Sequence, residues 1–279
     1  MDCEKVFETM VSHAIEYITA NGLHAGVLGV SGGIDSTVVA YIFKEVQLRL
    51  KERHGYHFRF VGVSMPTETT DKNEFRISEL VGNAFCDIFD VLDITDEARS
   101  ITLPHVEISG SVNNKFRIGN VKSRLRMIHL YDYAKAYGGI VLGTDNYTEY
   151  LLGYSTLGGD ALFDYCPIQY LWKTEIYELA NWFLAREISR AKWDRVHALS
   201  ESISIPPQAG LGITSTDLEE IGAPSYEIVD TILQYILSGE DFPNDINEEW
   251  IKNVARRWMN SEYKRNHPVV IEREDFNFE

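Results

Sequence analysis

Gly29-Val30-Ser31-Gly32-Gly33-Ile34-Asp35-Ser36 is the stretch that decides the fold class. It lies between a short apolar run, His24 to Val30, and a helical pattern from Ser36 to Leu50. The apolar run is typical of a buried strand. Glycines let a backbone come close to an anion, and the N–H groups of such a turn and of the first helical turn point into one concavity. The stretch therefore predicts a strand–loop–helix unit that binds phosphate.

The loop is not of the Walker type, because no GxxxxGK[ST] motif occurs in the chain. Asp35 would repel phosphates unless a cation lies between them, and Mg²⁺ is a hard ion that prefers carboxylate and phosphate oxygens. The alternative interpretation is a glycine turn in which Ser and Asp side chains cap a helix. Capping requires neither both glycines nor both serines, so the nucleotide interpretation is favoured.

Strand and helix patterns alternate on both sides of this loop. Strands are predicted at Phe58 to Met65, Asp87 to Ile94 and Ile140 to Gly143, and helices at 4–20, 72–84 and 118–137. This alternation predicts an α/β fold with a doubly wound, mostly parallel sheet. From about residue 172 onward the patterns are helical only, at 173–185, 189–200, 225–237 and 246–265. We expect a single domain spanning residues 1–279 with a helical C-terminal part.

Composition disfavours several classes of protein. With 26 Lys+Arg and 42 Asp+Glu the net charge is −16, which disfavours nucleic acid and anionic membranes as partners. The three cysteines contain no CxxC pair, so neither a disulfide framework nor a cysteine-built zinc site is expected. The polar start is unlike a signal peptide, and no apolar run reaches the roughly 18 residues of a membrane span. These features favour a cytoplasmic protein.

Residues 31–36 resemble the SGGxDS loop of the ATP pyrophosphatases, and motifs further along the chain narrow the resemblance. The following segments are similar to motifs of NAD synthetases, in the same order: 116–127 (FRIGNVKSRLRM), 143–149 (GTDNYTE), 153–176 with Asp160, Asp164, Pro167 and Lys173, 207–211 (PQAGL), 217–230 (DLEEIGAPSYEIVD) and EYKRNHP with Lys264. The resemblance covers most of residues 25–268. It implies an adenine nucleotide alpha-hydrolase-like fold.

The activity that the resemblance implies is ATP-dependent amidation of deamido-NAD with ammonia, through an NAD-adenylate, with release of AMP and pyrophosphate. Asp35 and Lys173 are implied as catalytic residues, and Asp35 and Glu149 as Mg²⁺ ligands. The implied ATP contacts are Gly29, Val30, Ser31, Gly32, Gly33, Ile34, Asp35, Ser36, Thr144, Lys173 and Gln208. The implied deamido-NAD contacts are Phe116, Arg124, Asp164, Tyr263 and Lys264.

The residues themselves leave plainer interpretations open. Lys122, Arg124 and Arg126 lie on one predicted helix, where charged residues usually form a solvated face. Asp160 and Asp164 are also consistent with loop anchors.

Four positions depart from the family pattern: Ser64 stands where an arginine is expected, Leu157 for a lysine, Gln208 for a threonine and Tyr263 for a histidine. The positions implied for ATP and Mg²⁺ are mostly intact, whereas those for the dinucleotide are altered. An amide-forming ATP pyrophosphatase acting on a different carboxylate is therefore the alternative. A tRNA-modifying enzyme is disfavoured by the charge, and a protein without catalysis by the presence of Asp35, Glu149 and Lys173.

The resemblance also implies a homodimer built around the helix at 118–137. An apolar stripe on that helix is consistent with a dimer contact and equally with a core helix inside one chain. The stripe consists of Met127, Leu130, Tyr131, Ala134 and Tyr137. The synthetase motifs begin by residue 29 and run to about 268, which leaves no room for an amidase domain of roughly 100 residues or more. We therefore expect free ammonia as the nitrogen source.

Overall fold

The computed structural model describes residues 1–102, 111–206, 216–266 and 268–276. Its centre is a sheet of four strands, β1 (Ala25–Gly29), β2 (Arg59–Ser64), β3 (Ile88–Val91) and β4 (Gly139–Leu142), in the order β3-β2-β1-β4. Each neighbouring pair is parallel, with Val27 opposite Val61 of β2 and Val141 of β4. The predicted parallel α/β sheet is confirmed.

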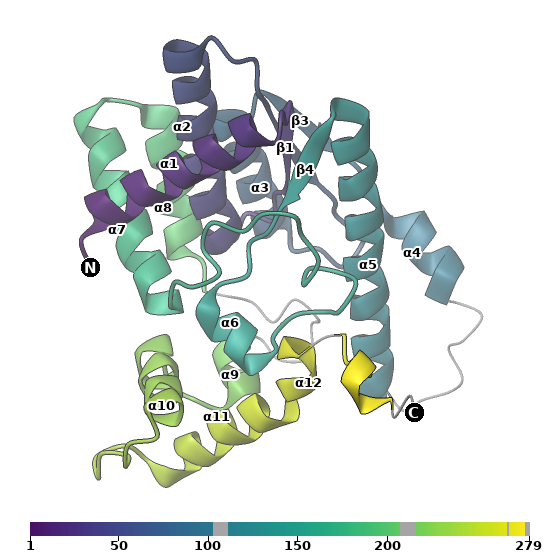
Figure 1. Ribbon diagram of the computed structural model, residues 1–279, viewed down its shortest axis with the longest axis vertical. Coiled ribbons are helices and arrows are strands. Elements are labelled where there is room, and N and C mark those ends of the chain that lie inside the picture. The colour runs from purple at the N-terminus through teal and green to yellow at the C-terminus, as the bar shows by residue number, and fades with distance from the viewer. Residues whose placement is uncertain (103–110, 207–215, 267, 277–279) are drawn as a thin grey trace.

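Helices cover both faces of the sheet (Figure 1). They are α1 (Cys3–Ala20), α2 (Ile34–His54), α3 (Lys72–Phe85), α4 (Thr95–Thr102), α5 (Ser111–Tyr137), α6 (Tyr147–Leu152), α7 (Lys173–Ser189), α8 (Trp193–Ser204), α9 (Asp217–Ile221), α10 (Tyr226–Ser238), α11 (Glu248–Asn260) and α12 (Glu262–Arg265). A short 3₁₀ turn spans Arg273–Asp275.

Alternation along each strand explains the two layers of core. Successive side chains of a strand point to opposite faces, so Leu28 joins the cluster under α1, α2, α3, α7 and α8, while Val27 joins the cluster under α4 and α5. A third cluster joins α6, α9, α10 and α11, and contains Leu151, Val229 and Val254. This last cluster holds the helical C-terminal part beside the sheet's carboxyl edge, where α6 follows β4.

The packing of the long helix α5 decides between the two interpretations of its apolar stripe. Met127, Leu130 and Ala134 are buried against Val27 and Val141 of the chain's own sheet. The stripe is therefore an intrachain core contact, as one of the two interpretations held. The outward side of the helix carries Ile128, which is 64% exposed.

Three short helices were not anticipated from the sequence, namely α4, α6 and α9. Each has eight residues or fewer, which is too short for a helical period to stand out. The predicted helix at 189–200 is displaced: α7 continues to Ser189, Ala191 takes a positive φ of 54°, and α8 begins at Trp193. Among the described residues, no helix is both long and apolar enough to cross a membrane.

Strand order sets where a ligand can bind. From β1 the chain moves outward through β2 to β3 and then returns to the other side of β1 as β4. The carboxyl ends of β1 and β4 thus flank the switch point of the sheet, which is where open α/β sheets bind ligands. The loop after β1 and the segment after β4 both leave the sheet there.

Candidate active site

The glycine loop at the end of β1 is held in one shape from two sides. Gly32 has φ +88°, and a Cβ there would lie 2.7 Å from the carbonyl oxygen of Glu74 and 2.8 Å from the amide of Ser78. Only glycine fits this close approach to α3. On the other side, Ser202 of α8 donates from Oγ to the carbonyl of Gly32 at 3.1 Å.

Hydroxyl groups shape the start of α2. Ser36 Oγ and Thr37 Oγ1 donate to the carbonyl of Gly33 at 3.0 and 2.9 Å, and Ser31 Oγ lies 3.1 Å from Ser36 Oγ. Gly33 is the N-cap residue of α2 and has no side chain to occupy the free amides of the first turn. The helix N-terminus is therefore open toward an anion, as the sequence predicted.

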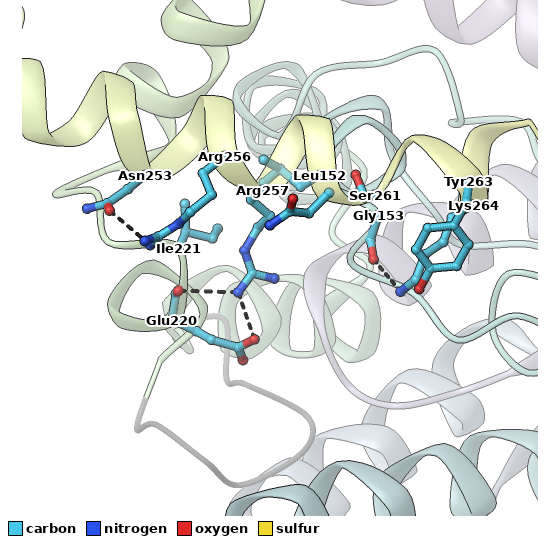
Figure 2. Close-up of a pocket in the computed structure, with 11 residues that line it drawn as sticks. Leu152, Gly153, Glu220, Ile221, Asn253, Arg256, Arg257, Ser261, Tyr263 and Lys264 are labelled. Carbon is cyan, nitrogen blue, oxygen red and sulfur yellow. Dashed lines mark hydrogen bonds and ion pairs between the residues drawn. The ribbon is translucent and has the colours of Figure 1, made fainter.

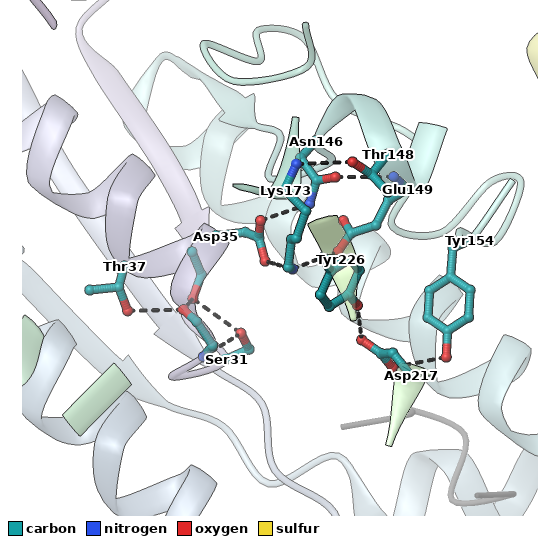
Figure 3. Close-up of polar contacts among 12 residues, drawn as sticks. Ser31, Asp35, Thr37, Asn146, Thr148, Glu149, Tyr154, Lys173, Asp217 and Tyr226 are labelled. Atoms are coloured by element: carbon teal, nitrogen blue, oxygen red, sulfur yellow. Dashed lines mark hydrogen bonds and ion pairs between the residues drawn. The ribbon is translucent and has the colours of Figure 1, made fainter. Parts of the chain in front are cut away.

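Three predicted residues from distant parts of the chain meet beside this loop (Figure 3). The Nζ of Lys173 donates to Asp35 Oδ2 at 2.6 Å and to Glu149 Oε1 at 2.9 Å. The lysine side chain is 2% exposed, and the two carboxylate side chains are 16% and 17% exposed. Asp35 comes from the first turn of α2, Glu149 from α6 and Lys173 from the first turn of α7. The structure thus brings the predicted catalytic and metal residues together.

A set of hydrogen bonds fixes the segments that carry these groups. Asn146 caps α6 by accepting from the Glu149 amide at 3.0 Å, and its Nδ2 donates to Asp35 Oδ1 at 2.8 Å. Asp230 of α10 accepts from the Thr148 hydroxyl at 2.5 Å, and Thr148 Oγ1 in turn accepts from the Lys173 amide at 2.9 Å. The helical C-terminal part therefore positions both Glu149 and Lys173.

The charges of the group depend on one another. Burial alone would lower the pKa of Lys173, but Asp35 and Glu149 outweigh burial and hold its pKa well above the ordinary value. Burial raises the pKa of Glu149 to about 7, although the ammonium of Lys173 acts in the opposite direction. Lys173 is therefore a permanent cation, and it lies between two carboxylates.

A third acidic side chain, Asp217, lies near Lys173. The ring of Tyr226 lies 5.5 Å from Lys173 Nζ, and its hydroxyl donates to Asp217 Oδ2 at 3.1 Å. Tyr154 donates to Asp217 Oδ1 at 2.9 Å (Figure 3). The same hydroxyl also donates to Glu220 Oε2 at 3.0 Å. Burial raises the pKa of Asp217, and Lys173 opposes that shift. Tyr226 and Asp217 are buried, and Tyr154 and Glu220 are half-buried.

The donor set of Asp35 and Glu149 fits Mg²⁺. This ion commonly binds one or two carboxylates and completes its shell with phosphate oxygens and water. Glu149 Oε2 has no hydrogen bond within the described residues, so it is available to a metal. In those residues no group of three His, Cys, Asp or Glu is arranged to hold a metal by itself. A metal here would therefore rely on ligands from ATP and water.

Three of the residues predicted for the second substrate, Phe116, Arg124 and Asp164, lie on α5 and in the segment after β4. Phe116 is partly exposed, and Arg124 Nε donates to the carbonyl of Leu157 at 3.1 Å. Asp164 accepts from the Val141 amide at 2.8 Å and from the Tyr131 hydroxyl at 3.1 Å. Asp164 therefore anchors its loop to β4 and α5, as one interpretation held. Its contact with a ligand remains a prediction.

Tyr263 and Lys264 line a cavity of about 320 Å³ beside α11 (Figure 2). Lys264 Nζ donates to the carbonyls of Gly153 at 2.7 Å and Ser155 at 2.5 Å, and Tyr263 is 58% exposed. The same cavity is lined by Arg257, which is paired with Glu220 at 2.8 Å. Lys264 thus connects α12 to the segment after α6, and it also lines a cavity.

Two of the positions that depart from the family pattern lie among described neighbours. Ser64 Oγ lies 2.8 Å from Ser78 Oγ, so this position packs against α3. Leu157 lines a smaller cavity of about 120 Å³ together with Lys264 and Asp145. Asp145 is 7% exposed, its carboxylate has no hydrogen bond among the described residues, and burial raises its pKa well above the ordinary value. The cavity thus contains one lysine, one buried carboxyl group and an aliphatic side chain.

Thr144 lies half-buried between β4 and α6, and Gln208 lies outside the described residues. Sequence reasoning assigned no role to Asn146, Thr148, Asp217 or Asp230, which orient the group around Lys173. For Asn146 a signal existed, because Asn followed three residues later by Glu is a helix-start pattern. The others act through contacts between distant segments.

The fold and the site define a class: α/β proteins with a phosphate-binding glycine loop of the ATP pyrophosphatase type. Comparison with known proteins specifies the family. The family model for NAD synthase matches residues 6–268, so the chain belongs to the NAD synthase family.

Individual relatives agree with this assignment. The chain is 32% identical over 272 residues to an NH(3)-dependent NAD(+) synthetase of Pyrococcus furiosus, with 94% of each protein covered. A solved NH3-dependent NAD synthetase from Campylobacter jejuni, in complex with the nitrate ion, superposes with a TM-score of 0.72 at 25% identity, covering 98% of this chain and 100% of that one. The NMN synthetase from Francisella tularensis has the same fold, with a TM-score of 0.77 at 21% identity and coverage of 98% and 99%.

Proposed function

We propose that this chain is an ammonia-dependent NAD synthetase, a ligase that converts deamido-NAD, ATP and ammonia into NAD, AMP and pyrophosphate. The observation that carries the proposal is the group formed by Lys173, Asp35 and Glu149 at the mouth of the glycine loop. A buried cation between two carboxylates next to a helix N-terminus suits a polyphosphate with its metal. Membership of the NAD synthase family supports the choice of reaction.

In the first step, the glycine loop and the open N-terminus of α2 hold the phosphates of ATP. The nicotinate carboxylate of deamido-NAD attacks the α-phosphorus, a new C–O–P bond forms, and pyrophosphate leaves with the electron pair of the broken P–O bond. Lys173 faces the place where this negative charge grows, and a fixed cation in a water-poor site stabilises such charge. The contacts of Gly29–Ser36, Thr144, Lys173 and Gln208 with ATP are proposals.

In the second step, ammonia attacks the activated carbonyl carbon, the C–O bond to AMP breaks, and a proton leaves the nitrogen. Adenylation is needed because a free carboxylate offers no leaving group to ammonia. We assign the binding of deamido-NAD to Phe116, Arg124, Asp164, Tyr263 and Lys264, which surround the segment after β4 and the adjoining cavities.

We assign Mg²⁺ to Asp35 and Glu149, whose carboxylates lie on either side of Lys173 Nζ. When bound, the ion supplies positive charge to the phosphates. The chain's own part is to hold these two carboxylates in place through Asn146 and Asp230.

A second candidate reaction is the same amidation of a different carboxylate, and Leu157 is the observation that favours it. The family pattern has a lysine there, whereas this chain places an aliphatic side chain in the cavity beside Lys264. Nicotinic acid mononucleotide is a suitable competitor, because it carries the same carboxylate and lacks the adenylate half of deamido-NAD.

We further propose a single domain of this type over residues 1–279, a cytoplasmic location and a homodimer. The family match over residues 6–268 supports the domain, and the use of ATP supports the location. Because the apolar stripe of α5 packs against the sheet, a dimer through this helix would use its outward side around Ile128. Light scattering of the purified protein measures the number of chains in the particle.

The test of the proposed function is a reaction with purified protein, ATP, Mg²⁺ and ammonium chloride. Deamido-NAD and nicotinic acid mononucleotide are supplied in separate reactions and then together. We expect NAD and AMP in equal amounts and a higher kcat/KM for deamido-NAD. A higher kcat/KM for the mononucleotide would favour the second candidate, and AMP formation with neither would refute both.

A further inference from the structure

Arg126 is a cation of the segment 116–127, which resembles a family motif, and the proposed function gives this residue no role. It lies on α5, and its side chain is half-buried, so it is not part of a solvated helix face. Its Nε donates to the carbonyl of Met65 at 3.2 Å, just beyond the carboxyl end of β2. This corrects the interpretation of Lys122, Arg124 and Arg126 as a solvated face, at least for Arg126.

Among the residues that the structure describes, the guanidinium of Arg126 has few partners. A guanidinium has five N–H groups, and within the described residues only the Nε–H of Arg126 has a hydrogen bond. No carboxylate among those residues forms an ion pair with it, although the chain has 42 acidic residues. Burial lowers the pKa of Arg126, while Asp160 and Glu74 act in the opposite direction. A desolvated cation whose other N–H groups have no partner in the described part of the chain indicates an absent anionic partner.

The two acidic side chains that act on Arg126 show where it lies. Glu74 is in the first turn of α3, and its carbonyl oxygen is next to Gly32 of the phosphate loop. Asp160 accepts from Ser123 Oγ at 2.6 Å and from the Thr156 amide at 2.8 Å, in the segment next to Leu157. Arg126 therefore stands between the loop that holds the phosphates of ATP and the segment assigned to the second substrate.

One turn earlier, Lys122 occupies the same side of α5, since residues four apart lie one above the other. Its Nζ donates to Thr69 Oγ1 at 2.8 Å and likewise has no acidic partner among the described residues. Arg126 and Lys122 thus cover the connection from β2 to α3 with positive charge. The family's arginine before this connection is Ser64 here, which faces Ser78 instead.

We propose that Arg126 is a catalytic residue that contacts the phosphate at which the two substrates join, the α-phosphate of ATP that becomes the phosphate of the acyl-adenylate. This role rests on the proposed function. Its free N–H groups match two non-bridging oxygens of one phosphate. While the carboxylate forms its bond to phosphorus and pyrophosphate leaves, negative charge stays on those oxygens. The same contact stabilises AMP as the leaving group when ammonia attacks.

The test measures adenylation alone, as exchange of labelled pyrophosphate into ATP with deamido-NAD present and ammonia absent. We expect Arg126→Ala to lower the exchange rate by about 100-fold or more, with the KM for deamido-NAD within about threefold of wild type. Added guanidinium chloride at millimolar concentration should restore part of this exchange, since it refills the space of the lost group. The control is Lys135→Met, an exposed position on the same helix, which should exchange like the wild type.

Arg126→Lys keeps the charge without the forked geometry, and should lose about tenfold or more; it carries the test where the alanine variant fails to fold. Exchange of either folded variant within about threefold of wild type would overturn the role, as would a folded alanine variant that guanidinium does not stimulate. A loss confined to the KM for deamido-NAD would also overturn it, because Arg126 would then hold the dinucleotide's own diphosphate. A wild type without exchange would refute the proposed function itself.

Discussion

Replacing Lys173 by methionine removes the cation between Asp35 and Glu149 and keeps a side chain of similar length. In the folded protein Lys173 Nζ lies 2.6 and 2.9 Å from the two carboxylates and is 2% exposed. Breaking a buried ion pair from one side costs about 3–5 kcal/mol, because the other charge is left without a partner. Total free energies of unfolding are roughly 5–15 kcal/mol. We therefore expect Lys173→Met to lower the free energy of unfolding by about 3–5 kcal/mol near pH 8.

The loss should depend on pH in a set direction. The pKa of Glu149 is raised to about 7 in the wild type, above its ordinary value of 4.5, and without the lysine it rises further. A carboxyl group whose pKa is raised by folding gives stability below its unfolded pKa, and that stability is lost as the pH rises through the folded pKa. The difference between variant and wild type should therefore be smaller near pH 6 than near pH 8.

Urea unfolding in EDTA at both pH values measures this difference, since EDTA keeps Mg²⁺ from replacing the lysine. Lys252→Met is the control: Lys252 is 74% exposed and paired with Glu248, which should be worth only about 0.3–0.5 kcal/mol. A loss below about 1 kcal/mol for Lys173→Met near pH 8, or a larger loss near pH 6, would refute the reasoning.

Three further outcomes follow from the site. Gly32→Ala should destabilise the fold by about 1–3 kcal/mol and raise the KM for ATP, because a Cβ there meets Glu74 and Ser78. The control is Gly55→Ala, which is also at positive φ but in open space. Equal effects of the two substitutions would contradict this prediction. Leu157→Lys should tighten the binding of deamido-NAD or leave it unchanged, because it adds a cation beside Lys264 and Asp145. Calorimetry measures this binding, and clearly weaker binding would mean that Leu157 makes an apolar contact with the substrate. Ammonium should support turnover, and ammonia-free glutamine should not. Burial raises the pKa of the Cys86 and Cys166 thiols to about 12, so neither is an activated thiolate that could release ammonia from glutamine. Glutamine-driven turnover that a thiol-alkylating reagent abolishes would overturn this prediction.

Local patterns were sufficient for the sheet and the phosphate loop. The strands around Val27, Val61 and Val141 are short apolar runs, and the loop with Gly32 carries its chemistry in adjacent residues. The family resemblance added Glu149 and Lys173, which lie 114 and 138 positions after Asp35. No periodicity could have paired these residues, because their contact depends on the strand order.

The interior of the site was harder to predict. Asp230 looks like an ordinary charged position of an amphipathic helix, yet it is 2% exposed and fastens Thr148 and Thr174. Arg124 and Arg126 belong to the same motif and differ in the burial of their side chains. Arg124 is exposed, while Arg126 is half-buried beside Met65. Spacing in the sequence does not predict how far a helical side chain is buried, because burial depends on what packs over the helix.

The central claim is that the carboxylate of deamido-NAD is activated as an adenylate before ammonia attacks. Deamido-NAD labelled with ¹⁸O in the nicotinate carboxylate tests this directly, with mass spectrometry of AMP and pyrophosphate after a reaction with ammonium and Mg²⁺. One labelled oxygen should pass into each AMP, because the carboxylate oxygen bonded to phosphorus leaves with it, and pyrophosphate should carry none. Label in pyrophosphate, or unlabelled AMP alongside newly formed NAD, would contradict the account.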